Sequence, residues 1–239
     1  MSRGQQITGG RRALVGIAVA SVAVQFLALT VLRSPGPAGV PTYVDWLPLS
    51  LQNVFSGRLW TLLSYSLVHD VNAPTHLLFN LIALFFLAPP LERRWGFGAF
   101  MHLWVVAVLG GALLTVVAEL AGMTHATTVG MSAGIMGLLA AWSWLHPEST
   151  ILLMFVFPVR GRWVLPLVVG VDVLMFAYGS DLALMAHLGG VVGAWLALRG
   201  WTRPRLIITR LKALRDRRSR EKAKRRFRVV EGGRRDDLN

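Results

Sequence analysis

Six long apolar runs constrain what this chain can fold into. They cover approximately residues 13–32, 76–91, 97–120, 129–145, 163–179 and 182–198. A helix of roughly 20 apolar residues crosses the hydrocarbon core of a bilayer, so each run is a candidate membrane span. Only 15% of the residues are charged, whereas soluble domains carry about a quarter. We therefore predict an all-α polytopic membrane protein, and the composition excludes a soluble globular enzyme.

The basic residues predict how these spans are oriented, because short cytoplasmic loops carry an excess of Lys and Arg. With the N-terminus inside, the outer side receives only Arg33 and Arg58. The inner side receives the rest, namely Arg3, Arg11, Arg12, Arg93, Arg94, Arg160, Arg162, Arg199 and the C-terminal cluster. Six spans then place both termini in the cytoplasm. The first run is longer than the apolar region of a signal peptide, so we interpret it as a retained helix.

Charge also divides the chain into three parts. We expect a short cytoplasmic N-terminus over residues 1–12, a six-helix membrane domain over 13–202 and a basic cytoplasmic tail over 203–239. The tail holds 15 of the 25 Lys and Arg residues. Such a segment favours binding to anionic lipid headgroups or simply enforces the topology. It carries one aromatic residue, Phe227, so we do not expect nucleic acid binding.

Two connections differ from plain turns. The outer loop over residues 33–75 is rich in aromatic residues, which favour the headgroup region, so we expect it to lie partly in the outer leaflet. The apolar stretch 151–159 is followed by Arg160 and Arg162. A seventh span there would break the charge pattern, so we predict a re-entrant or interfacial segment on the inner side.

Five polar residues within the apolar runs are candidates for a functional site. Polar side chains are costly in a bilayer and tend to face the protein interior. His76 and Asn80 are four residues apart and share one helical face. The predicted topology places both, together with Ser132 and His187, in the outer half of the membrane. Asp172 lies near the depth of His187, where we expect a structural hydrogen bond or a cavity-facing carboxylate rather than a third catalytic residue.

Ser132 stands where a nucleophile would be well placed. It lies in Gly130-Met131-Ser132-Ala133-Gly134 at the start of the fourth run. A helix N-terminus has unpaired N–H groups and a positive dipole end, which suit an oxyanion. Pairs of small residues four apart allow helices to approach closely, as a Ser132–His187 hydrogen bond requires. Those pairs are Ala133/Gly137, Ala186/Gly190 and Gly189/Gly193.

Each signal alone has a structural interpretation. A serine in a membrane helix commonly bonds its own turn, and a buried histidine is commonly a satisfied core residue. The combination of His76-x-x-x-Asn80, Gly130-x-Ser132 and Ala186-His187-x-x-Gly190 on three runs at one depth favours a nucleophile, a base and oxyanion donors.

At these residues the chain resembles the rhomboid family of intramembrane serine proteases. Leu91-Glu92-Arg93-Arg94-Trp95-Gly96 is similar to the family's E-x-x-x-G turn. The resemblance implies a six-helix bundle, a Ser132–His187 dyad, and oxyanion stabilisation by His76, Asn80 and the Ser132 backbone N–H. It also implies substrates that are transmembrane proteins, cleaved in or near their spans at the outer side. We expect the location to be a bacterial cell (inner) membrane.

Three positions depart from that family pattern. Thr61 follows Trp60 where the family often has Arg, so the role of that arginine is either missing or moved to Arg58. Ala133 follows the serine where Gly is usual, and Met136 stands where an aromatic ring often lies on the catalytic histidine.

Other classes of protein fit the sequence less well. The chain has no cysteine and six histidines, so we expect neither a metal site nor a cofactor. A transporter would show internal symmetry and paired midplane charges, whereas Asp172 is the one midplane carboxylate. A non-proteolytic rhomboid-like protein that binds or escorts membrane helices is the alternative, and such proteins typically lack the Ser or the His that this chain has.

Overall fold

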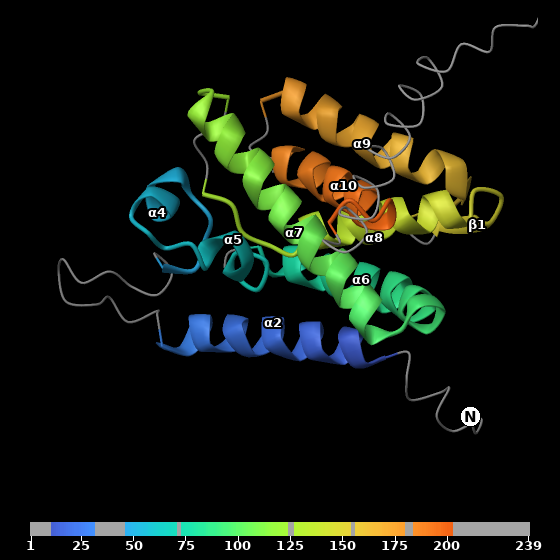
Figure 1. The fold of residues 1–239 in the computed structure, drawn as a ribbon, viewed down its shortest axis with the longest axis horizontal. Coiled ribbons are helices and arrows are strands. Elements are labelled where there is room, and N and C mark those ends of the chain that lie inside the picture. The colour runs from blue at the N-terminus through green and yellow to red at the C-terminus, as the bar shows by residue number, and fades with distance from the viewer. Residues whose placement is uncertain are drawn as a thin grey trace, which may run out of the picture. The chain divides into compact units, whose positions relative to one another are not determined.

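The computed structural model describes residues 11–31, 46–70, 73–123, 127–153, 156–179 and 184–202. The chain divides into two units, residues 1–199 and 200–239. The fold described below is that of the first unit (Figure 1). The predicted basic tail, residues 203–239, lies outside the described residues.

A helix forms at each of the six apolar runs. These helices are α2 (Arg12–Val31), α6 (Pro74–Trp95), α7 (Phe97–Leu120), α8 (Ser132–Leu145), α9 (Gly161–Ala177) and α10 (Leu184–Leu198). Two of them, α6 and α7, are long and apolar enough to cross a membrane by themselves. Shorter apolar helices cover residues 12–27, α8 and α10. Two short helices, α4 (Leu51–Phe55) and α5 (Thr61–Ser64), lie in the predicted outer loop.

The segment after α8 forms strands, so the all-α prediction is wrong for this part of the chain. Strands β1 (Thr150–Leu153) and β2 (Phe157–Arg160) pair antiparallel, with Thr150 opposite Arg160 and Leu153 opposite Phe157. The Gly161 N–H then donates to the Ser149 carbonyl at 2.8 Å. Each strand has only four residues. Pairing of the two strands satisfies backbone N–H and C=O groups that an irregular segment would leave without a partner.

Glycines bring the central helices together. Helix α10 packs against α7, α8 and α9 (Figure 1). A Cβ added at Gly189 would lie 2.7 Å from the Gly111 Cα, and one at Gly110 would lie 3.1 Å from the Gly193 Cα. The backbones of α7 and α10 therefore touch, as the predicted small-residue pattern requires.

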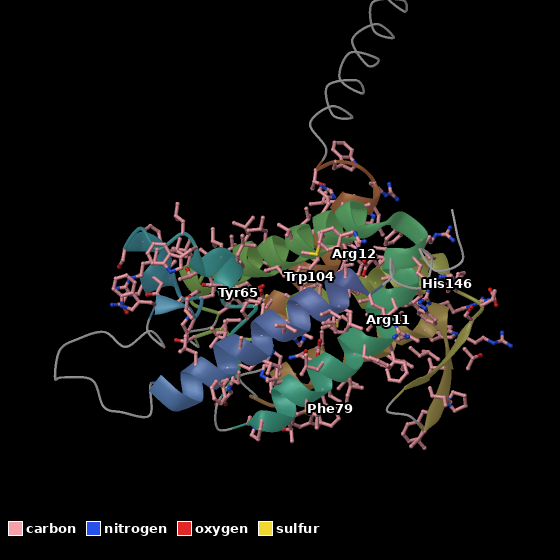
Figure 2. All side chains as sticks on the ribbon, turned by 90° about the horizontal axis from the view of Figure 1, so that it is seen from below. Arg11, Arg12, Tyr65, Phe79, Trp104 and His146 are labelled. Atoms are coloured by element: carbon pink, nitrogen blue, oxygen red, sulfur yellow. The ribbon has the colours of Figure 1, made fainter. Side chains whose placement is uncertain are left out.

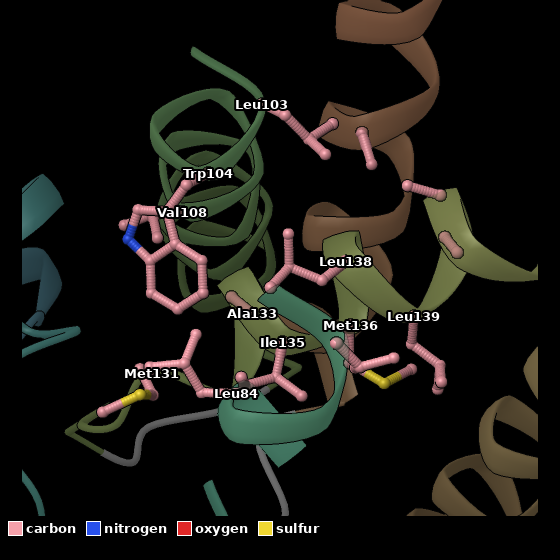
Figure 3. Packing of buried hydrophobic residues seen from close by; sticks show 14 of the residues in the cluster. Leu84, Leu103, Trp104, Val108, Met131, Ala133, Ile135, Met136, Leu138 and Leu139 are labelled. Atoms are coloured by element: carbon pink, nitrogen blue, oxygen red, sulfur yellow. The ribbon is translucent and has the colours of Figure 1, made fainter. Parts of the chain in front are cut away.

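Helix α8 lies in the core between α6 and α7. Figure 3 shows Leu84 of α6 and Val108 of α7 around Ile135 and Leu138 of α8, all of them buried. The indole ring of Trp104, also on α7, covers the α8 backbone at Gly134, where an added Cβ would lie 2.7 Å from the ring. This packing fixes the helix that begins at Ser132.

Large apolar side chains also cover the outside of the helices (Figure 2). Exposed examples are Leu78, Phe79, Phe85 and Phe86 on α6, Leu113 and Val117 on α7, and Val171, Val173 and Leu174 on α9. An apolar surface of this extent is suited to lipid rather than to water.

A buried carboxylate joins the start of α2 to the end of α6. Glu92 is 1% exposed, and its two oxygens accept the backbone N–H groups of Arg12 at 3.2 Å and Ala13 at 3.0 Å. The first N–H groups of a helix have no partner within it, and the N-terminal dipole favours an anion. Glu92 therefore anchors α2 to the bundle.

We expect Glu92→Ala to lower the free energy of unfolding by about 2–5 kcal/mol, because the buried N–H of Ala13 and the partly buried N–H of Arg12 lose their acceptor. Glu92→Gln keeps one acceptor oxygen and should cost less. Thermal unfolding in detergent, followed by circular dichroism, measures both variants. The control is Glu119→Gln, since Glu119 is only partly buried and accepts one N–H, that of Leu51 at 2.8 Å. A midpoint for Glu92→Ala no lower than that of this control would contradict the anchoring role.

Candidate active site

Ser132 is the first residue of α8, and the chain before it is held from two sides. The Gly130 N–H donates to the Tyr65 carbonyl at 2.9 Å, and the Met131 N–H donates to His69 Nε2 at 3.4 Å. Gly130 has a φ of +108°, a conformation that side chains rarely adopt. The sharp turn at Gly130 thus places Ser132 at the start of α8, where it is half-buried.

The residues that hold this turn are themselves anchored. The Tyr65 hydroxyl donates to the Val108 carbonyl of α7 at 2.8 Å, and the His69 N–H donates to Gln25 Oε1 of α2 at 3.1 Å. Sequence reasoning did not select Tyr65, His69 or Gln25 as site residues. A glutamine within the apolar run of α2 was the available signal, because an amide in such a helix needs a buried partner.

The loop before α5 is attached to the same region. Leu49 and Thr128 form a β-bridge, with backbone hydrogen bonds of 2.9 and 3.0 Å. The loop arginine, Arg58, lies over the ring of Trp46 at 4.6 Å, and its guanidinium donates to Asn53 Oδ1 at 2.8 Å. Glu119, near the end of α7, accepts the backbone N–H of Leu51 at the start of α4.

His76 lies directly against the turn. A Cβ added at Gly130 would lie 2.6 Å from His76 Cε1 and 2.9 Å from His76 Nε2. The His76 ring also meets the ring of His69 edge-on, with centroids 5.3 Å apart. Glycine at 130 is therefore required both for the backbone conformation and for the space that the His76 ring occupies.

One turn further along α6, Asn80 is 7% exposed. Its Nδ2 is buried and has no hydrogen-bond partner among the residues that the structure describes. A buried amide donor without an acceptor is costly, and a catalytic role is one reason why a protein retains such a group. The unpaired N–H is a donor of the kind that an oxyanion needs.

Helices α8 and α10 meet at the residues that adjoin Ser132 and His187. An added Cβ at Gly111 of α7 would lie 2.6 Å from the Ala133 Cβ and 2.8 Å from the Ala186 carbonyl oxygen. An added Cβ at Gly190 would also clash with the Ala133 carbonyl. Ala133, which follows Ser132, and Ala186, which precedes His187, thus both contact Gly111. The alanine side chain fits at position 133 because Gly111 and Gly190 have no side chains.

His187 has two further neighbours. Its Nδ1 lies 2.8 Å from Asp172 Oδ2 of α9, and the side chains are 13% and 12% exposed. His187 also interacts electrostatically with His76 of α6. The expected hydrogen bond of Asp172 is therefore present, and its partner is the candidate base. Met136, at the position where the family often has an aromatic ring, is buried in the core (Figure 3).

His69 provides a pH-dependent contact to the turn. Burial, together with the nearby His76, lowers the pKa of His69 to about 4. The neutral ring can accept the Met131 N–H, whereas a protonated Nε2 cannot. The contact is therefore intact throughout the neutral range.

Acidification should destabilise the fold through His69. In the unfolded chain a histidine titrates near pH 6.5, so below that pH the unfolded state binds a proton that the folded state excludes. Stability is fully present above about pH 6.5 and falls by up to roughly 3 kcal/mol as the pH approaches 4. Unfolding midpoints of the wild type and His69→Gln over this range measure the effect. The wild-type midpoint should fall more steeply, and parallel curves would contradict the assignment.

Three matches place the chain among known proteins. Residues 56–203 match the family model described as Rhomboid domain. The chain is 28% identical over 173 residues to the Arabidopsis thaliana protein named "RHOMBOID-like protein 12, mitochondrial", covering 66% of this chain and 50% of that protein. It is 31% identical over 143 residues to "Putative rhomboid protease YdcA" of Bacillus subtilis, covering 60% of this chain and 67% of that protein.

The chain thus spans half the length of the Arabidopsis relative that it matches. The matched domain includes Ser132 and His187 and all of α6 to α10. With more than half of its residues within that domain, the chain belongs to the rhomboid family of membrane-embedded proteins.

Proposed function

We propose that this protein is an intramembrane serine endopeptidase in which Ser132 is the nucleophile and His187 the general base. The observation that carries the proposal is the packing at Gly111, which both Ala133 and Ala186 contact. It brings the start of α8 and the start of α10 to the same place on α7. The two side chains that would have to cooperate are the immediate chain neighbours of these contact residues.

The chemistry follows from the residues present. The Ser132 Oγ attacks the scissile carbonyl carbon while its proton passes to His187 Nε2. The oxyanion forms beside the Ser132 N–H, Asn80 Nδ2 and the His76 ring. The C–N bond then breaks and the leaving amine takes the proton from His187. Water hydrolyses the resulting acyl-enzyme by the same route and frees Ser132.

The setting of this chemistry is a membrane with the active site open toward its outer side. We propose six spans with both termini in the cytoplasm, supported by the distribution of Arg residues. A bacterial cell (inner) membrane is the proposed location; one matched relative is from the bacterium Bacillus subtilis, whereas the Arabidopsis relative is named mitochondrial. Substrates are transmembrane proteins whose spans unwind locally, because a helical segment hydrogen-bonds its own carbonyl groups.

Reconstitution into liposomes with single-span model substrates tests the proposal. The wild type should cut a substrate whose span carries helix-destabilising residues, and Ser132→Ala should not. The matched control is Ser143→Ala, because Ser143 is a buried serine further along the same helix. Binding of the substrate by both proteins without any cleavage would instead favour a non-proteolytic role in binding or escorting membrane helices.

For the basic tail we propose binding to anionic lipid headgroups, supported by its 15 Lys and Arg residues against five acidic ones. Removal of residues 203–239 should leave proteolysis within a few-fold of the full chain, since the active site opens on the opposite side. A peptide of the tail should bind vesicles of anionic lipid at low salt and lose them at high salt. Equal binding to neutral vesicles would contradict the lipid proposal.

A further inference from the structure

Asp172 is a carboxylate placed on an apolar helix. It is buried, whereas its neighbours Val171 and Val173 are exposed on the outer surface of α9. Charged side chains within membrane helices are expensive and usually face the interior with a partner. Asp172 therefore points into the bundle, away from the apolar exterior of its own helix.

The partner of this carboxylate is the candidate base. Asp172 Oδ2 lies 2.8 Å from His187 Nδ1, a distance typical of a charge-assisted hydrogen bond. No other hydrogen bond or ion pair involves this carboxylate within the part of the chain that the structure describes. Helices α9 and α10 contact each other, so the pair joins two packed helices.

The nitrogen that is contacted matters for the chemistry. An ionised Asp172 accepts a hydrogen bond, so the proton of a neutral His187 resides on Nδ1. Nε2 then carries the lone pair, which is the form that can take the proton of the Ser132 hydroxyl. After that transfer the imidazolium keeps its hydrogen bond to the carboxylate, which stabilises the charge formed in the transition state.

We propose that Asp172 is a positioning residue that holds His187 in the tautomer and orientation of a general base, making a Ser132–His187–Asp172 triad. The inference rests on the proposed protease function. It adds a residue from α9, which the sequence interpretation treated as structural. It also explains how the base is oriented where Met136 replaces the aromatic ring usual in the family.

Isosteric replacement tests the role. Asp172→Asn preserves the shape of the side chain and removes its charge, so we expect kcat to fall by about 10²–10⁴-fold while KM stays within a few-fold. Asp172→Glu should recover part of the loss, since it restores the carboxylate. The matched control, Val173→Ala on the exposed face of α9, should retain wild-type kcat.

A spectroscopic measurement shows whether Asp172 positions the His187 ring or only stabilises the contact between α9 and α10. The full chain labelled with ¹⁵N-histidine is measured by solid-state NMR. The ring signals of His187 are those that disappear in His187→Ala. The wild type should show the proton on Nδ1, and Asp172→Asn should shift the population toward the other tautomer. Ser132 labelling by a fluorophosphonate should slow in parallel, in protein that retains its unfolding midpoint.

The experiments distinguish failure of the Asp172 positioning role from failure of the protease assignment. Asp172→Asn with unchanged kcat and labelling rate, beside an inactive Ser132→Ala, overturns the positioning role and leaves the protease assignment intact. If Asp172→Asn only lowers the unfolding midpoint, and the folded protein has wild-type kcat, the positioning role is overturned as well. Absence of Ser132-dependent cleavage and labelling in the wild type overturns the protease assignment, and this inference with it.

Discussion

Ser132→Ala and His187→Ala should each reduce cleavage of a transmembrane substrate to background. Serine proteases that lose one member of the catalytic unit fall by about 10⁴–10⁶-fold in kcat. The nucleophile and the base act in one step, so the double variant should be no worse than the weaker single variant. Initial rates in liposomes containing equal amounts of inserted protein measure all three.

Folding must be preserved for this comparison to be informative. Ser132 and His187 are both only partly buried, so truncation to alanine leaves the glycine contacts between α7, α8 and α10 intact. The unfolding midpoint of Ser132→Ala should therefore stay close to that of the wild type, whereas His187→Ala leaves the Asp172 carboxylate without its partner and should lower the midpoint. Substantial cleavage by a folded Ser132→Ala protein would contradict the proposed nucleophile.

Asn80→Ala should lower kcat by about 10²–10³-fold with little change in KM, because an oxyanion donor acts mainly in the transition state. The Nδ2 of this side chain has no hydrogen-bond partner within the described structure, so its loss should not break a structural bond made by that donor. Asn80→Asp is the matched variant: it keeps the shape but places an acceptor where a donor is needed, and should be at least as damaging. His76→Ala should have a similar or smaller effect.

Wild-type turnover in both Asn80→Ala and His76→Ala would show that α6 does not contribute to the site. A fall in stability without a fall in kcat would assign Asn80 to packing alone. Kinetics and thermal unfolding of the same preparations distinguish these outcomes.

The helices could be predicted from sequence because each of the six apolar runs is long and carries few polar residues. The β1–β2 hairpin could not, since a four-residue strand such as Thr150–Leu153 has no distinctive periodicity and depends on its partner. The number of spans and their orientation stay predictions, drawn from charge and length.

The candidate site was predictable where its residues are conspicuous. Ser132, His187, His76 and Asn80 are polar residues within apolar runs, and Gly111 contacts the chain neighbours of the first two. Tyr65, His69 and Gln25 were missed because their contacts join segments more than 40 residues apart. The 2.8 Å contact of Asp172 with His187 likewise depends on how α9 packs against α10, which no spacing rule indicates.

The most direct measurement of the central claim is covalent labelling with a fluorophosphonate, followed by mass spectrometry of the labelled peptide. This reagent reacts with an activated serine and does not depend on knowing the natural substrate. The account predicts one adduct, on Ser132, that is absent in Ser132→Ala, strongly slowed in His187→Ala and unchanged in Ser143→Ala. An adduct on another residue, or a wild-type chain that inserts and folds normally but is not labelled, would contradict it.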